Sequence, residues 1–141
     1  MFLGTYTPKL DDKSRFFLPA KFREALASGF VMTRQPDRCL AVWPKEAFLA
    51  QVQETAGGPS VAPKNRAFMR MIASGASDES ADAQGRVVIP QPLRDYAGLT
   101  KDVVVIGAFD HVEVWDQAEW AAYSASQEEV FAHLGEEIED E

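Results

Sequence analysis

The chain has 141 residues, with 14 Lys+Arg, 22 Asp+Glu and a formal net charge of −8. Its length suits one domain or two very small ones sharing a core, and 46% hydrophobic residues exclude a disordered chain. No membrane span or signal-peptide pattern is visible, and the single cysteine, Cys39, excludes an internal disulfide framework, so we expect a cytoplasmic protein.

The first predicted elements follow a turn. Asp11 opens the sequence DDKSR, where its carboxylate can accept a hydrogen bond from the backbone two residues on. A strand is expected over Arg15–Leu18, ended by Pro19, and then a short helix over Ala20–Ala27 with Gly29 beyond it.

Two strands, a helix and a connector complete this unit. The strands are expected over Phe30–Thr33 and Leu40–Trp43, and a helix begins at Pro44. A Gly-rich loop over Ala56–Ser60 leads to a second helix, Lys64–Ala73. We expect the apolar residues of this second helix (Phe68, Met69, Met71 and Ile72) either to form a subunit interface or to cover the core of the same chain.

The second half of the chain has the same order of elements. The turn sequence DAQGR starts at Asp82, and a strand over Arg86–Ile89 follows it. A helix comes next, with Pro92 near its start and Gly98 after its end. Strands are then expected over Val103–Ile106 and Val112–Trp115, followed by a helix from Asp116 with Trp120, Tyr123 and Val130 on its apolar face. The seven acids after Gln127 indicate a solvated or frayed tail.

These two halves are an internal repeat. At a constant offset of 71, Asp11, Arg15, Leu18, Pro19, Phe22 and Arg23 align with Asp82, Arg86, Ile89, Pro90, Leu93 and Arg94. At an offset of 72, Val42, Trp43 and Phe48 align with Val114, Trp115 and Trp120. Neither unit can bury much core alone, so we expect one α+β domain with a pseudo-twofold axis, intertwined or partly closed β-barrel pairing, and flanking helices. We divide it into repeat 1 (5–48), a helical connector (49–75), repeat 2 (76–119) and a C-terminal helix with an acidic tail (120–141).

The negative net charge hides an asymmetry between the halves. Residues 1–75 carry eleven basic and six acidic residues, a net charge of +5, whereas residues 76–141 carry three basic and sixteen acidic residues, a net charge of −13. The first half is therefore compatible with a polyphosphate partner such as nucleic acid.

The paired Asp-x-x-x-Arg-h-x-h-Pro motifs, about seventy residues apart, resemble those of the MraZ family, a duplicated relative of the SpoVT/AbrB swapped-hairpin DNA-binding domains. GTYTPKLDDKSRFFLPAKFR, ASGASDESADAQGRVVIPQPLRDYAGL and VEVWD carry the resemblance, which covers about residues 1–123. Ser14 departs from the usual family Gly, and Gln84 stands where a Lys would match Lys13.

The resemblance implies a nucleoid-associated transcriptional regulator that represses its own division and cell-wall gene cluster. It also implies a ring-like homo-oligomer that binds repeated short G-rich promoter boxes in double-stranded DNA. It assigns the DNA contacts to Asp11, Arg15, Asp82 and Arg86. Arg suits guanine, and Lys13 suits phosphate. Arg34 and Arg38 are candidates for further phosphate contacts or are solvated loop charges.

Other functions have weaker support in the sequence. Each Asp–Arg pair could simply hold its turn, and Arg23 and Arg94 could serve packing, subunit contacts or DNA. The alternative function is an oligomeric protein–protein assembly module without DNA binding, and nucleotide or RNA binding ranks lower. We expect no enzyme, cofactor, metal site or small-molecule substrate, because no pattern of catalytic or ligating residues is present. Cys39, Trp43 and Trp115 are expected to be buried.

Overall fold

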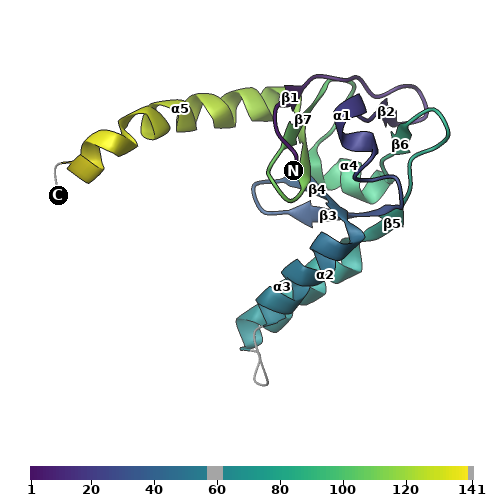
Figure 1. Cartoon of the computed structure of the whole chain (residues 1–141), viewed down its shortest axis with the longest axis horizontal. Helices are drawn as coiled ribbons and strands as arrows, with labels where there is room; N and C mark the ends of the chain where they lie inside the picture. Colours follow the sequence, from purple (N-terminus) through teal and green to yellow (C-terminus); the bar gives the residue numbers. More distant parts are fainter. Residues whose placement is uncertain (57–61, 140–141) are drawn as a thin grey trace.

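The computed structural model describes residues 1–56 and 62–139, and it contains the same series of elements twice (Figure 1). The first copy consists of β1 (Thr5–Tyr6), β2 (Arg15–Phe17), α1 (Ala20–Arg23), β3 (Phe30–Gln35), β4 (Cys39–Pro44) and α2 (Lys45–Ala56). After α3 (Pro63–Gly75), the second copy consists of β5 (Ser77–Glu79), β6 (Arg86–Val88), α4 (Gln91–Ala97), β7 (Val103–Gly107), β8 (Val112–Asp116) and α5 (Gln117–Glu139).

Strands from the two copies are interleaved in a six-stranded antiparallel sheet of order β1-β7-β8-β4-β3-β5, in which two central pairs, β7-β8 and β4-β3, are each flanked by an edge strand of the other copy. Strand β1 of the first copy pairs with β7 of the second, and β5 of the second pairs with β3 of the first. At the centre, Ala41 lies opposite Glu113, its own repeat equivalent at the offset of 72. The pseudo-twofold axis therefore passes through the middle of the sheet, and neither copy has a complete set of strand partners without the other.

A separate two-stranded ribbon pairs β2 with β6, again one strand from each copy. Phe16 lies opposite Val87, its equivalent at the offset of 71, so the same pseudo-twofold relation holds here. Beyond the ladder, Leu18 N–H donates to Gly85 O (2.9 Å) and Ile89 N–H donates to Ser14 O (3.0 Å).

The expectation of a partly closed barrel is wrong for the described residues, because no sheet closes on itself. Strands β1 and β5 are two and three residues long and form opposite edges of the larger sheet. The chain leaves those edges for the turns that precede β2 and β6, and these strands pair with each other rather than with the sheet. The result is an open sheet faced by a separate ribbon.

The main core lies between the inner face of the sheet and a layer made of the ribbon, α1 and α4. Strand alternation sends Leu40 and Val42 into this core, together with Phe16 and Val87 from the ribbon. On the outer face of the sheet, Cys39, Trp43 and Trp115 are buried beneath the helices, as expected from the sequence. The buried side chains of the ribbon therefore pack directly on the inner face of the six-stranded sheet.

Helix α1 is shorter than the sequence predicts, and α4 is capped where the sequence predicts. α1 ends at Arg23 rather than Ala27, because Ala27 N–H and Gly29 N–H donate to carbonyls only three residues back, which gives tight turns instead of an α-helix. α4 ends at Ala97 and is capped by Gly98, whose φ of 62° matches the predicted cap. The connector expected at Ala56–Ser60 falls mostly outside the described residues.

The C-terminal segment is helical rather than frayed, because α5 continues to Glu139. It projects away from the sheet on one side, whereas α2 and α3 extend together on another (Figure 1). None of the helices described in residues 1–56 and 62–139 has both the length and the apolar character needed to cross a bilayer.

Candidate nucleic-acid interface

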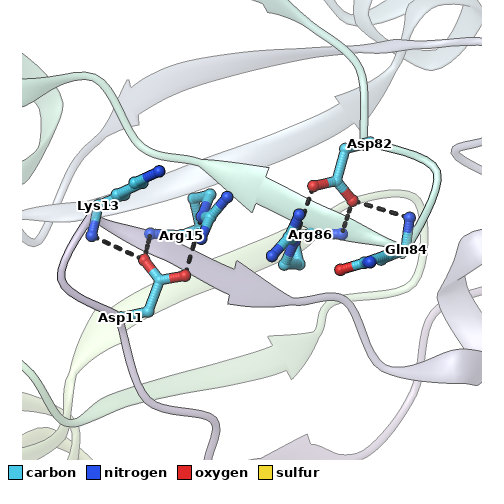
Figure 2. Close-up of polar contacts among 6 residues, drawn as sticks. All are labelled: Asp11, Lys13, Arg15, Asp82, Gln84 and Arg86. Carbon is cyan, nitrogen blue, oxygen red and sulfur yellow. Dashed lines mark hydrogen bonds and ion pairs between the residues drawn. The ribbon is translucent and has the colours of Figure 1, made fainter.

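Each ribbon strand begins with a turn that is organised by one carboxylate. Asp11 Oδ1 accepts from the backbone N–H groups of Lys13 and Arg15, both at 2.9 Å, and Oδ2 accepts from Arg15 Nε at 2.8 Å (Figure 2). Asp11 N–H also donates to Arg15 O (2.8 Å), which closes the turn from the backbone side. The Asp therefore holds both the turn and the side chain of the Arg four residues on.

The second turn repeats this geometry almost atom for atom. Asp82 Oδ1 accepts from the backbone N–H groups of Gln84 and Arg86, both at 2.9 Å, and Oδ2 accepts from Arg86 Nε at 2.7 Å (Figure 2). Both repeats thus contain the same contacts, in which one carboxylate holds the backbone of its turn and the side chain of the Arg, and the two arginines lie on the two strands of one ribbon.

Both carboxylates have a pKa below the ordinary value of 3.8. For Asp11 the largest cause is the backbone hydrogen bond from Arg15, with the Arg15 side chain adding to it. The backbone and side chain of Arg86 lower the pKa of Asp82 in the same way. These hydrogen bonds favour the ionised carboxylates, so each Asp–Arg pair is ionised at neutral pH.

The register of the ribbon places both arginines on one face. Arg15 lies opposite Val88, and Arg86 lies opposite Phe17, so these four residues alternate with the buried pair on the inner face. Arg15 and Arg86 are diagonal neighbours across the ladder, a spacing that long side chains can bridge. The outer face of the ribbon therefore presents two equivalent guanidinium groups.

Each guanidinium uses Nε for its aspartate, and the side chains of Arg15 and Arg86 are 21% and 25% exposed. Within the described part of the chain, no hydrogen bond engages the terminal nitrogens of Arg15 or Arg86. Arginine carries five N–H donors, and a pair of them can bind guanine O6 and N7 together. An antiparallel two-stranded ribbon also has the width that the DNA major groove admits. This arrangement can present two preoriented base-reading groups.

Sequence reasoning missed two further residues on this face. Phe17 is 54% exposed and Val88 is 46% exposed, although both lie in short strands of otherwise apolar sequence. The signal was the alternation within each strand, since the residues flanking a buried Phe16 or Val87 must face outward. Exposed apolar groups beside arginines suit the methyl group of thymine.

The two turns differ at one backbone position. Ser14 and Gly85 both have positive φ, 62° and 82° respectively. Glycine reaches this region at no steric cost, whereas Ser14 accepts strain to keep the same turn. A Cβ at Gly85 would also lie 2.7 Å from Arg23 Nε, so a side chain here would have to displace the Arg23 guanidinium.

Lys13 and Gln84 occupy equivalent positions on the outside of the two turns. Both side chains are exposed, and both residues use their backbone N–H to contact the aspartate. The ribbon therefore has a cation at one end and a neutral amide at the other.

Arg34 and Arg38 do not lie with the ribbon arginines in a single cluster. Arg34 Nη2 donates to Met71 O and to Ser74 Oγ (3.3 Å), which ties the end of β3 to α3. Arg38 Nη1 donates to Tyr96 O (3.4 Å), and both guanidinium groups lie within 6 Å of the Tyr96 ring, at 5.9 and 5.6 Å. Their contacts join the β3–β4 hairpin to the helices.

Arg23 and Arg94 are also tied to the backbone. Arg23 Nε donates to Leu18 O (3.1 Å), and Arg94 Nη1 donates to Ile89 O, the equivalent carbonyl of the other repeat. Each bond holds the helix against the end of its ribbon strand. The observed contacts of these two residues are therefore packing contacts.

His111 and Cys39 belong to the outer face of the sheet. His111 stacks on Trp43 (ring centroids 4.3 Å apart) and contacts Asp110 (2.9 Å) and Glu113 (3.1 Å). Burial opposes the charged imidazolium, but the two carboxylates outweigh it and raise the pKa of His111 above 6.5. Burial raises the pKa of the Cys39 thiol. Among the described residues, no group of three or more His, Cys, Asp or Glu side chains is arranged to hold a metal ion.

The sequence is similar to one family throughout its length. The model of the family described as MraZ protein, likened in that description to antitoxins, matches residues 1–71 and again 72–140. A Cutibacterium acnes protein named transcriptional regulator MraZ is 57% identical over 134 residues, which is 95% of this chain and 94% of that protein. Proteins of the same name from Micrococcus luteus and Corynebacterium jeikeium are 50% and 49% identical over 138 residues, or 98% of this chain and 96% of each relative. With its duplicated Asp–Arg turns, the chain belongs to the MraZ family.

Proposed function

We propose that the protein is a sequence-specific DNA-binding transcriptional regulator and that its ribbon reads DNA in the major groove. The observation that carries this proposal is the pair of equivalent Asp–Arg turns on one exposed face of an antiparallel ribbon. The relatives' name, transcriptional regulator MraZ, supports the same class of function.

In this proposal Arg15 and Arg86 contact guanine edges, and the aspartates fix their orientation. Each bidentate contact contributes about 1–3 kcal/mol of discrimination between bases. Lys13 contacts a phosphate, and Phe17 and Val88 contact thymine methyl groups or sugars. Arg34 and Arg38 remain candidates for flanking phosphate contacts, provided that they release part of their hold on α3 and Tyr96.

The finer parts of the proposal concern the target and the assembly. We propose repression of the protein's own division and cell-wall gene cluster through repeated short G-rich boxes, and association with the nucleoid in the cytoplasm. One ribbon offers few cationic contacts, so a single subunit binds weakly. A ring-like homo-oligomer that meets several boxes at once gains affinity through effective concentration.

The test is binding of purified protein to the DNA upstream of its own gene. Fluorescence anisotropy should show preference for that DNA over a scrambled fragment, and Arg15→Ala or Arg86→Ala should each weaken specific binding about 10-fold or more. Lys64→Ala removes one charge on α3, away from the ribbon, and should bind as tightly as the wild type.

Two outcomes would contradict the proposal in different ways. Wild-type affinity in both arginine variants would mean that the ribbon is not the reading face. Equal binding to promoter and scrambled DNA would instead favour the alternative, an assembly module without sequence recognition.

A further inference from the structure

The α5 helix carries an apolar stripe that begins on the body of the protein and continues beyond it. Trp120 and Tyr123 pack on Trp115, with ring centroids 5.2 and 4.9 Å apart. At 100° per residue, Val130, Phe131 and Leu134 continue the same side of the helix. We call this distal segment, residues 127–136, the arm.

The arm has no cover within its own chain. Val130, Phe131 and Leu134 are 55%, 77% and 44% exposed. A rise of 1.5 Å per residue places Leu134 about 21 Å beyond Trp120 along the axis. In Figure 1 the helix carries this segment away from the sheet and from every other element. A row of large apolar side chains in this position marks an interaction surface.

A groove of matching character lies on the other projecting part of the molecule. Helices α2 and α3 and the outer face of β3 and β4 enclose a cavity of about 480 Å³, lined chiefly by Trp43, Phe48, Leu49, Val52, Phe68 and Ile72. Phe68 and Ile72 also line a smaller hollow of about 150 Å³ across α3, together with Met71. Apolar surface therefore lies on both sides of α3, with Leu49, Phe68 and Met71 left exposed, and the larger hollow between α2 and α3 is called the α2–α3 groove.

The charges of the two surfaces are opposite. Arg66 and Arg70 are exposed on α3, and this helix contains no acidic residue. The arm carries Glu128, Glu129 and Glu136 and contains no Lys or Arg. Pairing of an arm with α3 brings unlike charges together, whereas pairing of two arms brings acids together.

We propose that the arm of one copy of this chain docks in the α2–α3 groove of a second copy. The mode is an amphipathic helix in an apolar groove, with Val130, Phe131 and Leu134 as anchors. Because α5 and the α2–α3 pair project in different directions, the arm cannot reach its own groove (Figure 1). Each copy therefore donates one arm and accepts another, a head-to-tail contact that forms a ring when the rotation closes.

This inference rests on the assembly part of the proposed function and adds the two surfaces that make the contact. It does not depend on DNA binding. The test uses two full-length variants, the arm variant Phe131→Glu with Leu134→Glu, and the groove variant Phe68→Glu, all at exposed positions. The matched control is His133→Ala, a truncation at an exposed position of the same helix that lies outside the apolar stripe.

Sedimentation velocity should show an assembled wild type and control, and a monomer for each variant at the same concentration. Each variant should associate with itself at least about 30-fold more weakly, as expected for the loss of central anchor residues. When mixed, the two variants should form a one-to-one dimer and nothing larger, because one retains its groove and the other its arm. Circular dichroism and thermal unfolding should show both variants folded.

Three results would overturn the proposal. A wild type that is monomeric would remove the assembly itself, even if it still prefers promoter DNA. Assembly of either variant at the wild-type size would place the contact elsewhere. Two monomeric variants that fail to associate when they are mixed would show that the arm and the groove do not bind each other.

Discussion

At the scale of single residues, each aspartate holds both the backbone of its turn and the side chain of the arginine four residues on. One carboxylate accepts two backbone N–H groups and one Arg Nε, so the backbone turn and the aim of the arginine depend on the same side chain. The arginine carries the recognition chemistry in our proposal, and the aspartate is a positioning residue.

Replacement of Asp11 and Asp82 by Asn tests this division of roles. The amide oxygen can still accept from the backbone N–H groups, but the amide NH2 cannot accept from the arginine Nε–H and the negative charge is lost. DNA affinity should therefore fall several-fold, less than for the arginine-to-Ala variants. Because the folded pKa of each carboxyl is depressed, its stabilisation is complete above 3.8 and disappears as pH falls through the folded pKa. Thermal unfolding of wild type and the double variant should therefore differ at pH 7 and converge in acid. A constant difference across that range would contradict the assigned role.

His111 gives a pH dependence of the opposite sign. Its folded pKa is raised above 6.5 by Glu113 and Asp110, so the charged imidazolium stabilises the fold below pH 6.5 and this contribution is lost as pH rises through the folded pKa. In His111→Gln, the loss of melting temperature should be larger at pH 5.5 than at pH 9. Loss of the stacking contact with Trp43 lowers both values equally, so only the difference between them reports the charge. An equal loss at both pH values would mean that folding does not raise the pKa of His111.

At the scale of elements, the sequence specified local structure better than pairing. The alternation around Phe16 and Val87, the prolines after each ribbon strand and Gly98 after α4 are local signals, and the structure follows them. The short polar strand β5 has no local signal for its partner, because its pairing with β3 depends on the packing of both repeats. The paired turns were likewise predictable, and the outward position of Phe17 follows from the same alternation around Phe16 once Phe16 is known to be buried.

The turns before β2 and β6 offer a direct test of backbone strain. Ser14→Gly relieves the strain of a non-glycine residue in the left-handed region, which is roughly 1–2 kcal/mol. The glycine also increases the chain entropy of the unfolded state, which lowers stability by about 0.5–1 kcal/mol. A net gain of about 0.5 kcal/mol in the free energy of unfolding is expected. Gly85→Ala should lose more than about 1 kcal/mol, because it adds strain and displaces Arg23.

Urea unfolding measures both changes in one series. The two midpoints should move in opposite directions although the turns are equivalent in the repeat. A shift of both midpoints in the same direction would mean that the backbone conformation of one turn differs from the other.

At the scale of the whole molecule, duplication determines what each half can do alone. The equivalence of the halves and the single core were predictable, because neither repeat has enough apolar residues to bury a core. Closure of the sheet was not, since it depends on how far the edge strands extend, and β1 and β5 stop after two and three residues. The helical character of the acidic end was also missed, although alanine and glutamate favour a helix there.

The proposed arm contact and the proposed DNA contact can be separated by the number of boxes on the DNA. The ribbon belongs to one chain, so the variant Phe131→Glu with Leu134→Glu should bind a fragment with one box as tightly as the wild type. On a fragment with several boxes, the assembled wild type should gain about 10²–10⁴-fold from effective concentration, and the arm variant should gain little. Fluorescence anisotropy on the two fragments measures this ratio, and His133→Ala should retain the wild-type gain. Loss of one-box affinity in the arm variant would instead mean that the acidic helix is needed to keep the ribbon in place. Arg15→Ala should show the converse pattern, weaker binding to both fragments with assembly unchanged, because its contacts are made within each subunit.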